Sequence, residues 1–187
     1  MKKGLCTLLL LLVAALAGCG ERPESQAAQG TQPSGETQQV DQGTQQPSEE
    51  TVKLEVTGLV EQFGKKLRMV SLLAPVQDVR ASMMEHYGDL VSPSLLEKWQ
   101  GDPENAPGRL TSSPWPDRIE VLSVEKVSAD RYRVKGEIIE VTSAEQEKAE
   151  AAAKRPVTFE VGKIGDRWRI DAAGLGAYEE GQADAGN

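Results

Sequence analysis

VTFEVGKIGDRWRIDA, residues 157–172, holds two β-rich runs on either side of a glycine–aspartate pair. A two-residue turn at that pair predicts an antiparallel hairpin. In this register Val161 lies opposite Ile170 and Phe159 lies opposite Ala172, which brings apolar side chains together on one face. The stretch therefore predicts two neighbouring strands of an antiparallel sheet.

Two further β-rich runs precede this hairpin, at residues 118–127 and 131–141. The apolar residues of the second run change parity at Gly136, which predicts a bulge or a sharp bend there. Residues 143–155 are polar and rich in alanine and glutamate. We expect them to form a protruding connection that is briefly helical between the two hairpins of a bent sheet.

The first half of the chain has a helical period instead. Apolar residues recur at three- and four-residue steps over residues 59–74, which predicts an amphipathic helix that ends before Pro75. A second helix is predicted over residues 76–87, stopped near Gly88.

A third, short helix is predicted after Ser92 and Pro93, which supply an N-cap and a proline at the first helical position. Residues 101–117 contain four prolines and two glycines, and they predict a long structured loop before the sheet. Helices followed by an antiparallel sheet predict an α+β fold.

This order of elements resembles the NTF2-like, cystatin-like folds. The segments at the hairpin turns, 130–134 (DRYRV) and 165–171 (GDRWRID), are similar to the hairpins of that group. Residues 60–178 also resemble uncharacterised predicted lipoproteins of Gram-positive bacteria. The resembling segments are 63–67 (FGKKL), 109–119 (RLTSSPWPDRI) and 134–140 (VKGEIIE). The resemblance implies helices packed on a curved sheet and brings no established activity, because NTF2-like domains serve as enzymes, carriers and interaction modules.

The N-terminus has the pattern of an export signal. Lys2 and Lys3 precede a mostly apolar stretch over residues 5–17, which is shorter than the about 20 apolar residues that a membrane-spanning helix needs. The end of the stretch, Leu16-Ala17-Gly18-Cys19, resembles a bacterial lipobox. The resemblance implies transfer of diacylglycerol to the Cys19 thiol, cleavage before Cys19, and addition of a palmitate-type chain to the new terminus in many species. Two or more acyl chains hold a protein stably at a membrane.

A polar segment separates this signal from the predicted fold. Residues 20–50 contain three apolar residues, too few to offset the entropy of ordering, and as a coil they span roughly 30 Å. We therefore divide the chain into a signal peptide (1–18), the lipidated cysteine with a disordered tether (19–50), a folded domain (51–178) and a disordered tail (179–187). A fragment that starts near Thr51 is expected to be a soluble monomer.

Composition excludes several classes of function. The formal charge of −8 argues against a general nucleic-acid binder, since phosphate backbones require clustered lysine and arginine. Both cysteines precede residue 20, and His86 is the single histidine. We therefore expect no metal site, no cofactor and no disulfide in the domain.

Isolated polar residues suggest no coherent catalytic set. His86 as a general base would need a pocket and an orienting carboxylate, and we interpret it as a partly exposed helix histidine. Acidic pairs such as Glu137 and Glu140, or Asp166 and Asp171, are interpreted as solvated surface, because general acid–base chemistry needs two carboxylates across a cleft.

Trp115 stands between two prolines in a segment that enters the first strand. It either lines a ligand pocket at the mouth of the sheet or anchors the long loop on the core, and we favour the anchor.

A basic stripe is the other candidate contact surface. Arg131, Arg133 and Lys135 share a strand face, and Arg167 and Arg169 flank a tryptophan in the last strand. These cations either meet an anionic polymer or an acidic partner, or pair with glutamates across strands, and we favour the pairs.

Two functions remain open. We expect a non-enzymatic lipoprotein at the outer, extracytoplasmic face of the cell membrane, whose domain binds an envelope protein or an anionic polymer through the concave sheet and the Trp115 loop. The alternative is a small-molecule carrier or enzyme whose pocket lies between the helices and the sheet, with His86, Tyr87 or Tyr132 supplying polarity.

Overall fold

The computed structural model describes residues 47–148 and 150–180. The expected signal peptide, Cys19, the tether up to residue 46 and the last seven residues lie outside the described residues. Within the described part, no helix combines the length and the apolar character needed to cross a membrane.

The first helix, α1 (Glu49–Lys66), begins earlier than the sequence pattern predicted. Ser48 caps it by accepting a hydrogen bond from the backbone N–H of Thr51 at 3.2 Å. Val52 and Val56 extend the buried stripe toward the N-terminus, and the helix starts two residues before residue 51.

The same helix also ends eight residues before the predicted end at Ala74. A short 3-10 turn, η1 (Leu67–Met69), follows it. The chain then pairs with a distant segment: the N–H of Arg109 donates to the carbonyl of Val70 at 2.8 Å, and the N–H of Leu72 donates to the carbonyl of Arg109 at 2.9 Å. This long-range pairing takes backbone groups that a continued helix would use.

The next two helices confirm the sequence prediction. Helix α2 (Val76–Tyr87) starts after Pro75, and α3 (Pro93–Gly101) is capped by Ser92, whose hydroxyl accepts from the N–H of Leu95 at 3.1 Å. The predicted long loop follows, with one 3-10 turn, η2 (Pro103–Asn105), inside it.

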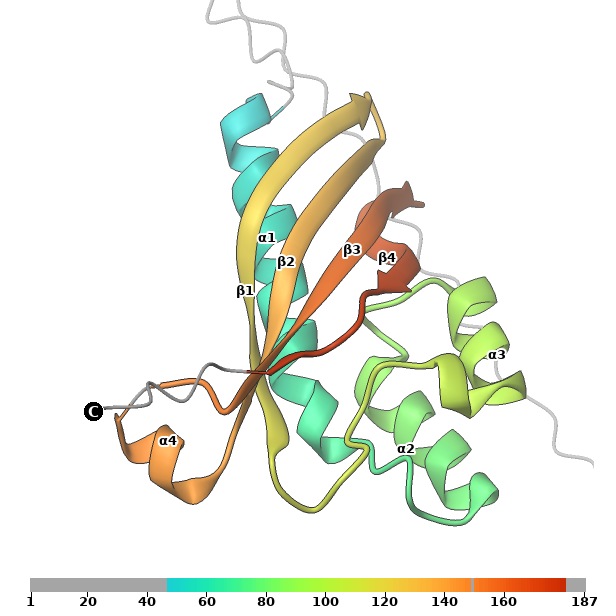
Figure 1. Cartoon of the computed structure of the whole chain (residues 1–187). Helices are drawn as coiled ribbons and strands as arrows, with labels where there is room; N and C mark the ends of the chain where they lie inside the picture. Colours follow the sequence, from blue (N-terminus) through green and yellow to red (C-terminus); the bar gives the residue numbers. More distant parts are fainter. Residues whose placement is uncertain (1–46, 149, 181–187) are drawn as a thin grey trace, which may run out of the picture. The chain divides into compact units, whose positions relative to one another are not determined.

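The second half of the chain forms an antiparallel sheet in the order β1-β2-β3-β4 (Figure 1). Its strands are β1 (Trp115–Ser128), β2 (Arg131–Val141), β3 (Ala153–Ile164) and β4 (Arg167–Leu175). The short helix α4 (Ser143–Lys148) protrudes between β2 and β3, as expected. A last short strand, β5 (Glu179–Glu180), pairs with the start of β3 and carries the ordered chain two residues past Tyr178.

Two details of register differ from the prediction. Val161 does lie opposite Ile170, but Phe159 lies opposite Ala173 rather than Ala172, because the pairing shifts between Glu160 and Val161. The bulge expected in β2 lies in its neighbour instead: Val121 pairs with Gly136 and Ser123 pairs with Lys135, which leaves Leu122 as the extra residue of β1.

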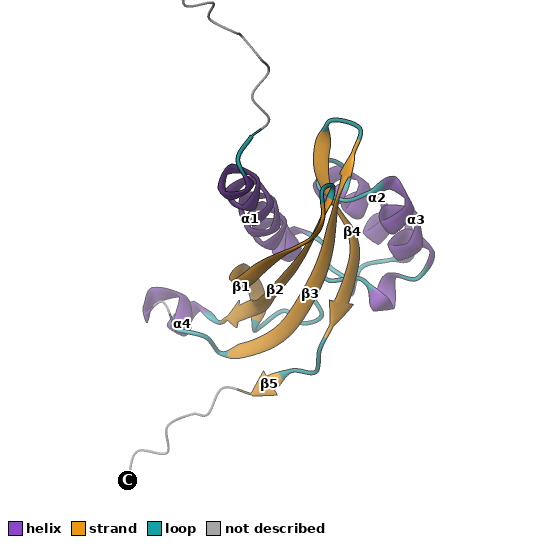
Figure 2. Ribbon diagram, turned by 90° about the horizontal axis from the view of Figure 1, so that it is seen from above, coloured by secondary structure: helices purple, strands orange, loops and turns teal. Residues whose placement is uncertain are grey.

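Helices and sheet share one core. Buried residues of α1, α2 and α3 pack with Tyr132, Val134, Phe159, Val161 and Ile170 of the sheet. Figure 2 shows the curved strands from above, with α1 at β1 and with α2 and α3 near β4. Helices first and a curved antiparallel sheet afterwards confirm the α+β prediction.

Candidate interaction surface

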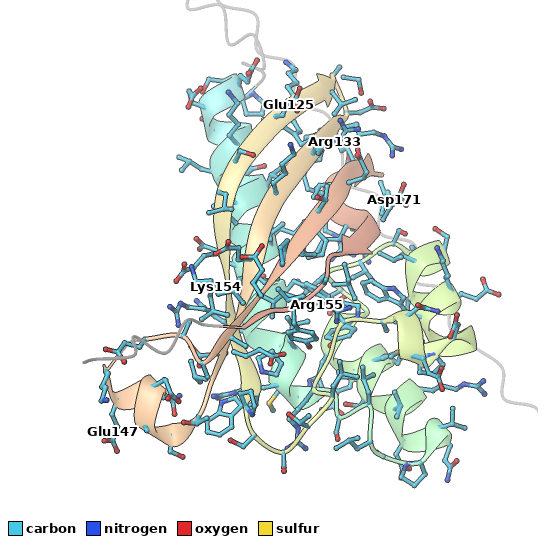
Figure 3. All side chains as sticks on the ribbon, viewed as in Figure 1. Glu125, Arg133, Glu147, Lys154, Arg155 and Asp171 are labelled. Atoms are coloured by element: carbon cyan, nitrogen blue, oxygen red, sulfur yellow. The ribbon has the colours of Figure 1, made fainter. Side chains whose placement is uncertain are left out.

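The strands present one side to the helices and the opposite side, here called the outer face, to solvent. Residues that alternate with the core residues of β2 and β3 point to the outer face, since side chains alternate along a strand. Over residues 131–137 of β2 and their neighbours on β1, β3 and β4 they are mostly charged: Glu125, Arg131, Arg133, Lys135, Glu137, Lys154, Glu160 and Asp171. Farther along β2, Ile139 and Val141 have the same parity but are buried. Figure 3 labels Glu125, Arg133, Lys154 and Asp171 on this side of the ribbon, with α1 behind the strands.

Opposite charges meet across the strands of this face. Arg133 Nε lies 2.7 Å from Glu160 Oε1, and Lys154 Nζ lies 3.0 Å from Glu137 Oε2. The hydrogen bond to Glu160 raises the pKa of Arg133 above its usual range. Charges of both signs are thus held at fixed positions on a rigid sheet.

Arg131 belongs to the same face. Its Nη2 lies 3.5 Å from Asp171 Oδ2, and both side chains are partly exposed to solvent. The basic stripe predicted from the sequence is therefore interleaved with carboxylates, which agrees with the salt-paired interpretation of Arg131 and Arg133.

Arg169 has a different role from these two arginines. Its Nη1 donates to the carbonyl oxygens of Gly88 and Val91, each at 2.9 Å. The neighbouring Ile170 exchanges backbone hydrogen bonds with Leu90 and Ser92 along the edge of β4. Arg169 thus fastens the connection between α2 and α3 to the sheet, and its guanidinium points inward to carbonyls.

Tyr132 lies on the core side of β2 and is 1% exposed. Its ring packs edge-on against Trp168, with the centroids 5.3 Å apart. Both residues line a hollow of about 430 Å³ at the start of α1, together with Lys126 and Lys163. The alternation of Tyr132 with Arg131 and Arg133 in the sequence places it on the side opposite to the basic stripe, as the structure has it.

Trp115 is the first residue of β1 and not part of the loop before it. It lies opposite Val141, which is 1% exposed, and its own side chain is half-buried. Trp115 is not among the residues of the shared core or those packed against it, so its role as an anchor stays a prediction.

The space between the helices and the sheet is filled with aromatic rings. The Phe63 ring lies 4.8 Å from Tyr87, 5.9 Å from Trp99 and 5.8 Å from Phe159, between ring centroids. The Tyr87 hydroxyl donates to the carbonyl of Pro107 at 2.9 Å, and burial raises the pKa of Tyr87. His86 is half-buried on α2. These rings fill the space around Phe63 between the helices and the sheet, which is where the alternative hypothesis placed a pocket with His86 or Tyr87.

Glu140 is a residue that the sequence interpretation misplaced. It shares the core side of β2 with Ile138 and is 7% exposed rather than solvated. The Tyr178 hydroxyl donates to its Oε1 at 3.0 Å, and Arg155 lies over the Tyr178 ring at 4.8 Å. Burial raises the pKa of the Glu140 carboxyl. The sequence gives no clear signal for this position, because the apolar residues change parity at Gly136 and residues of both parities, Ile138 and Ile139, are buried at this end of β2.

Among the residues that the structure describes, no group of three or more histidine, cysteine, aspartate or glutamate side chains is placed to hold a metal ion.

Comparison with known proteins gives structural neighbours alone. No family model matches the chain, and no curated protein matches it. Three solved structures are similar at low identity. An NTF2-like protein of unknown function from Shewanella oneidensis MR-1 is 13% identical, with 66% of this chain and 97% of that chain covered and a TM-score of 0.37.

The other two neighbours have TM-scores of 0.38. An NTF2-like protein involved in plasmid conjugation is 14% identical, with 66% of this chain and 48% of that chain covered. The intermembrane space region of the chloroplast protein ARC6 is 15% identical, with 71% and 99% covered. Two of the three are NTF2-like by name. The α+β assignment itself depends on the helices and strands of this chain.

Proposed function

We propose that the protein is a lipoprotein held at the extracytoplasmic face of the cell membrane, of the Gram-positive kind that its sequence resembles. The observation that carries this proposal is the N-terminus, where two lysines and a short apolar stretch lead to Leu16-Ala17-Gly18-Cys19. Acyl chains on Cys19 hold the protein at the bilayer.

The domain acts as a non-catalytic interaction module of the cell envelope. Its outer sheet face supports this role, because exposed charges of both signs stand at fixed spacing where no helix of the described domain covers them. A surface with charges of both signs recognises its partner mainly through complementary charges and less through the apolar area that the contact buries. The partner is an envelope protein or an anionic polymer.

Lipidation is tested by replacing each cysteine in turn. Cys19→Ser is expected to move the protein out of the membrane fraction and to remove metabolic fatty-acid label. Cys6→Ser is the matched control, since Cys6 lies in the segment that is removed, and it should leave both unchanged. Membrane-bound, labelled Cys19→Ser protein would contradict the anchor.

The interaction surface is tested by photo-crosslinking in intact cells. A crosslinking side chain at Lys135, on the outer face, is expected to capture a defined partner. The same side chain at Glu97, exposed on α3, is the control and should not capture it. Equal capture from both positions would contradict a role for the outer face.

A small-molecule carrier is the second candidate function. It is favoured by the hollow beside Tyr132 and Trp168, whose volume of about 430 Å³ lies within the range of ligand pockets. A ligand that raises the melting temperature of the protein, and does so less for Trp168→Ala, would support it.

A further inference from the structure

Three exposed apolar residues lie between the end of α1 and the start of α2, and a fourth, Leu110, follows Arg109, which pairs with this segment. Leu73 is 65% exposed, Met69 is 50%, Val76 is 49% and Leu110 is 39% exposed. We call these four residues the loop patch. Large apolar side chains that gather at one place on a surface usually mark a contact site.

Backbone hydrogen bonds hold the loop patch together although its members lie far apart in sequence. Ser71 forms an isolated parallel β-bridge with Arg109, which is next to Leu110 in the chain. The Ser82 hydroxyl donates to the carbonyl of Met69 at 3.1 Å, which ties the same segment to α2. The patch is therefore an ordered feature of the domain.

The loop patch follows the C-terminal end of α1, the end remote from Glu49 (Figure 1). The 18 residues of α1 separate the two ends by about 27 Å. None of the four lines the hollows at Glu61, at Tyr132, at Ser94 or at Asp102. Met69 ends η1 and Val76 begins α2, whereas Leu73 and Leu110 lie in loops.

Basic residues are close to these apolar residues in the chain. Lys65, Lys66 and Arg68 occupy the end of α1 and the turn after it, and Arg109 belongs to the bridge. Asp78, in the first turn of α2, is the nearby acidic residue on that helix. Residues 51–187 as a whole contain 18 basic and 23 acidic residues, a net charge of −5. Residues 65–76 thus hold three basic residues and no acidic one, within an acidic domain.

We propose that the loop patch and its basic neighbours form a second membrane contact, which docks the domain on an anionic lipid surface. Apolar side chains that enter the acyl boundary, with lysine and arginine at the level of the headgroups, are the chemistry of interfacial membrane binding. A lipid layer accommodates side chains that project from loops, whereas a protein partner would have to supply a matching groove. This inference rests on the proposed function, because the Cys19 anchor brings the domain to the bilayer.

The length of the connecting segment permits this docking. Residues 20–48 number 29 and reach on the order of 100 Å when extended. That reach exceeds the length of α1, so the remote end of the domain can meet the bilayer that holds Cys19.

The test uses the mature chain from residue 19 with Cys19→Ser, so that no acyl chain contributes. Binding is measured by co-flotation with vesicles of phosphatidylglycerol and phosphatidylcholine, and with vesicles of phosphatidylcholine alone. We expect binding to the anionic vesicles, weaker binding to the neutral ones, and loss of binding at high salt.

Variants assign the contact to the loop patch. Leu73→Gln is expected to weaken binding about tenfold, because a largely exposed leucine leaves the acyl boundary. Joint replacement of Lys65, Lys66 and Arg68 by glutamine should weaken it by at least about tenfold. Leu54→Gln is the matched control: Leu54 is 74% exposed near the other end of α1, and its replacement should leave binding unchanged.

Several results would overturn the proposal. They are absence of binding to anionic vesicles, equal binding to both vesicle types, or equal loss with Leu54→Gln. Crosslinks from position 73 to a protein in cells, without vesicle binding, would assign the patch to a protein partner instead. The vesicle assay uses unlipidated protein, so a negative result there would not contradict lipidation of Cys19. Conversely, a negative lipidation experiment would not change the result of the vesicle assay.

Discussion

Two glycines of α1 give a paired prediction about how this helix packs on the sheet. Gly58 is exposed, and a Cβ atom built there has no neighbour within 4 Å. Gly64 is buried, and a Cβ there would lie 2.5 Å from the backbone nitrogen of Ile119 in β1. The same change, glycine to alanine, should therefore have opposite effects at the two positions.

The magnitudes follow from the two environments. In a helix interior alanine is more favourable than glycine by about 0.5–1 kcal/mol, and Gly58→Ala should gain that amount. Gly64→Ala has the same gain, but the new methyl group must push the backbone of β1 from 2.5 Å toward an ordinary contact of 3.4 Å or more. Overpacking of this kind costs about 1–3 kcal/mol, so the net loss is about 0.5–2 kcal/mol.

Urea denaturation of the wild type and both variants, followed by far-ultraviolet circular dichroism, measures the free energy of unfolding. Equal slopes of the transitions would show that the denatured states are comparable. Stabilisation by both substitutions would refute the close approach of α1 to β1. Destabilisation by Gly58→Ala would refute the helical assignment of residues 49–58, which the sequence pattern missed.

Two further predictions concern Glu140 and the arginines of the sheet. The raised pKa of Glu140 means that the folded state holds its proton more tightly than the unfolded state, so its contribution to stability falls as pH rises above about 4.5 through the folded pKa. Glu140→Gln should therefore gain stability relative to the wild type between pH 4.5 and 7 in urea denaturation, and a constant difference would contradict the burial of this carboxyl. Arg169→Ala should lower the free energy of unfolding by about 1.5–3 kcal/mol, because a charged donor to two carbonyls is lost. Arg131→Ala should change it much less, and equal effects would contradict the different roles of the two arginines.

The parts of the fold that local signals specify were predictable. Pro75 and Gly88 bound α2, and Ser92 with Pro93 starts α3, because caps and prolines act on the neighbouring few residues. The limits of β2 also follow from its own alternation and from the turn before it.

Other features depend on residues distant in sequence. The end of α1 near Lys66 reflects the pairing with Arg109, which no local pattern contains. The pairing of Phe159 with Ala173 depends on a one-residue shift in β4. The inward role of Arg169 requires the carbonyl of Gly88 beside the sheet edge. The pattern of a single sequence shows which residues recur with a helix or strand period. It does not show which distant segments contact each other, and these features depend on such contacts.

The central claim is that the protein is anchored through Cys19. Mass spectrometry of the N-terminal peptide, from protein extracted out of cell membranes, tests it most directly. We predict that this peptide starts at Cys19 and carries the mass of a diacylglyceryl group, with or without a further acyl chain. An unmodified peptide that starts at another residue, or at an unmodified Cys19, would contradict the account.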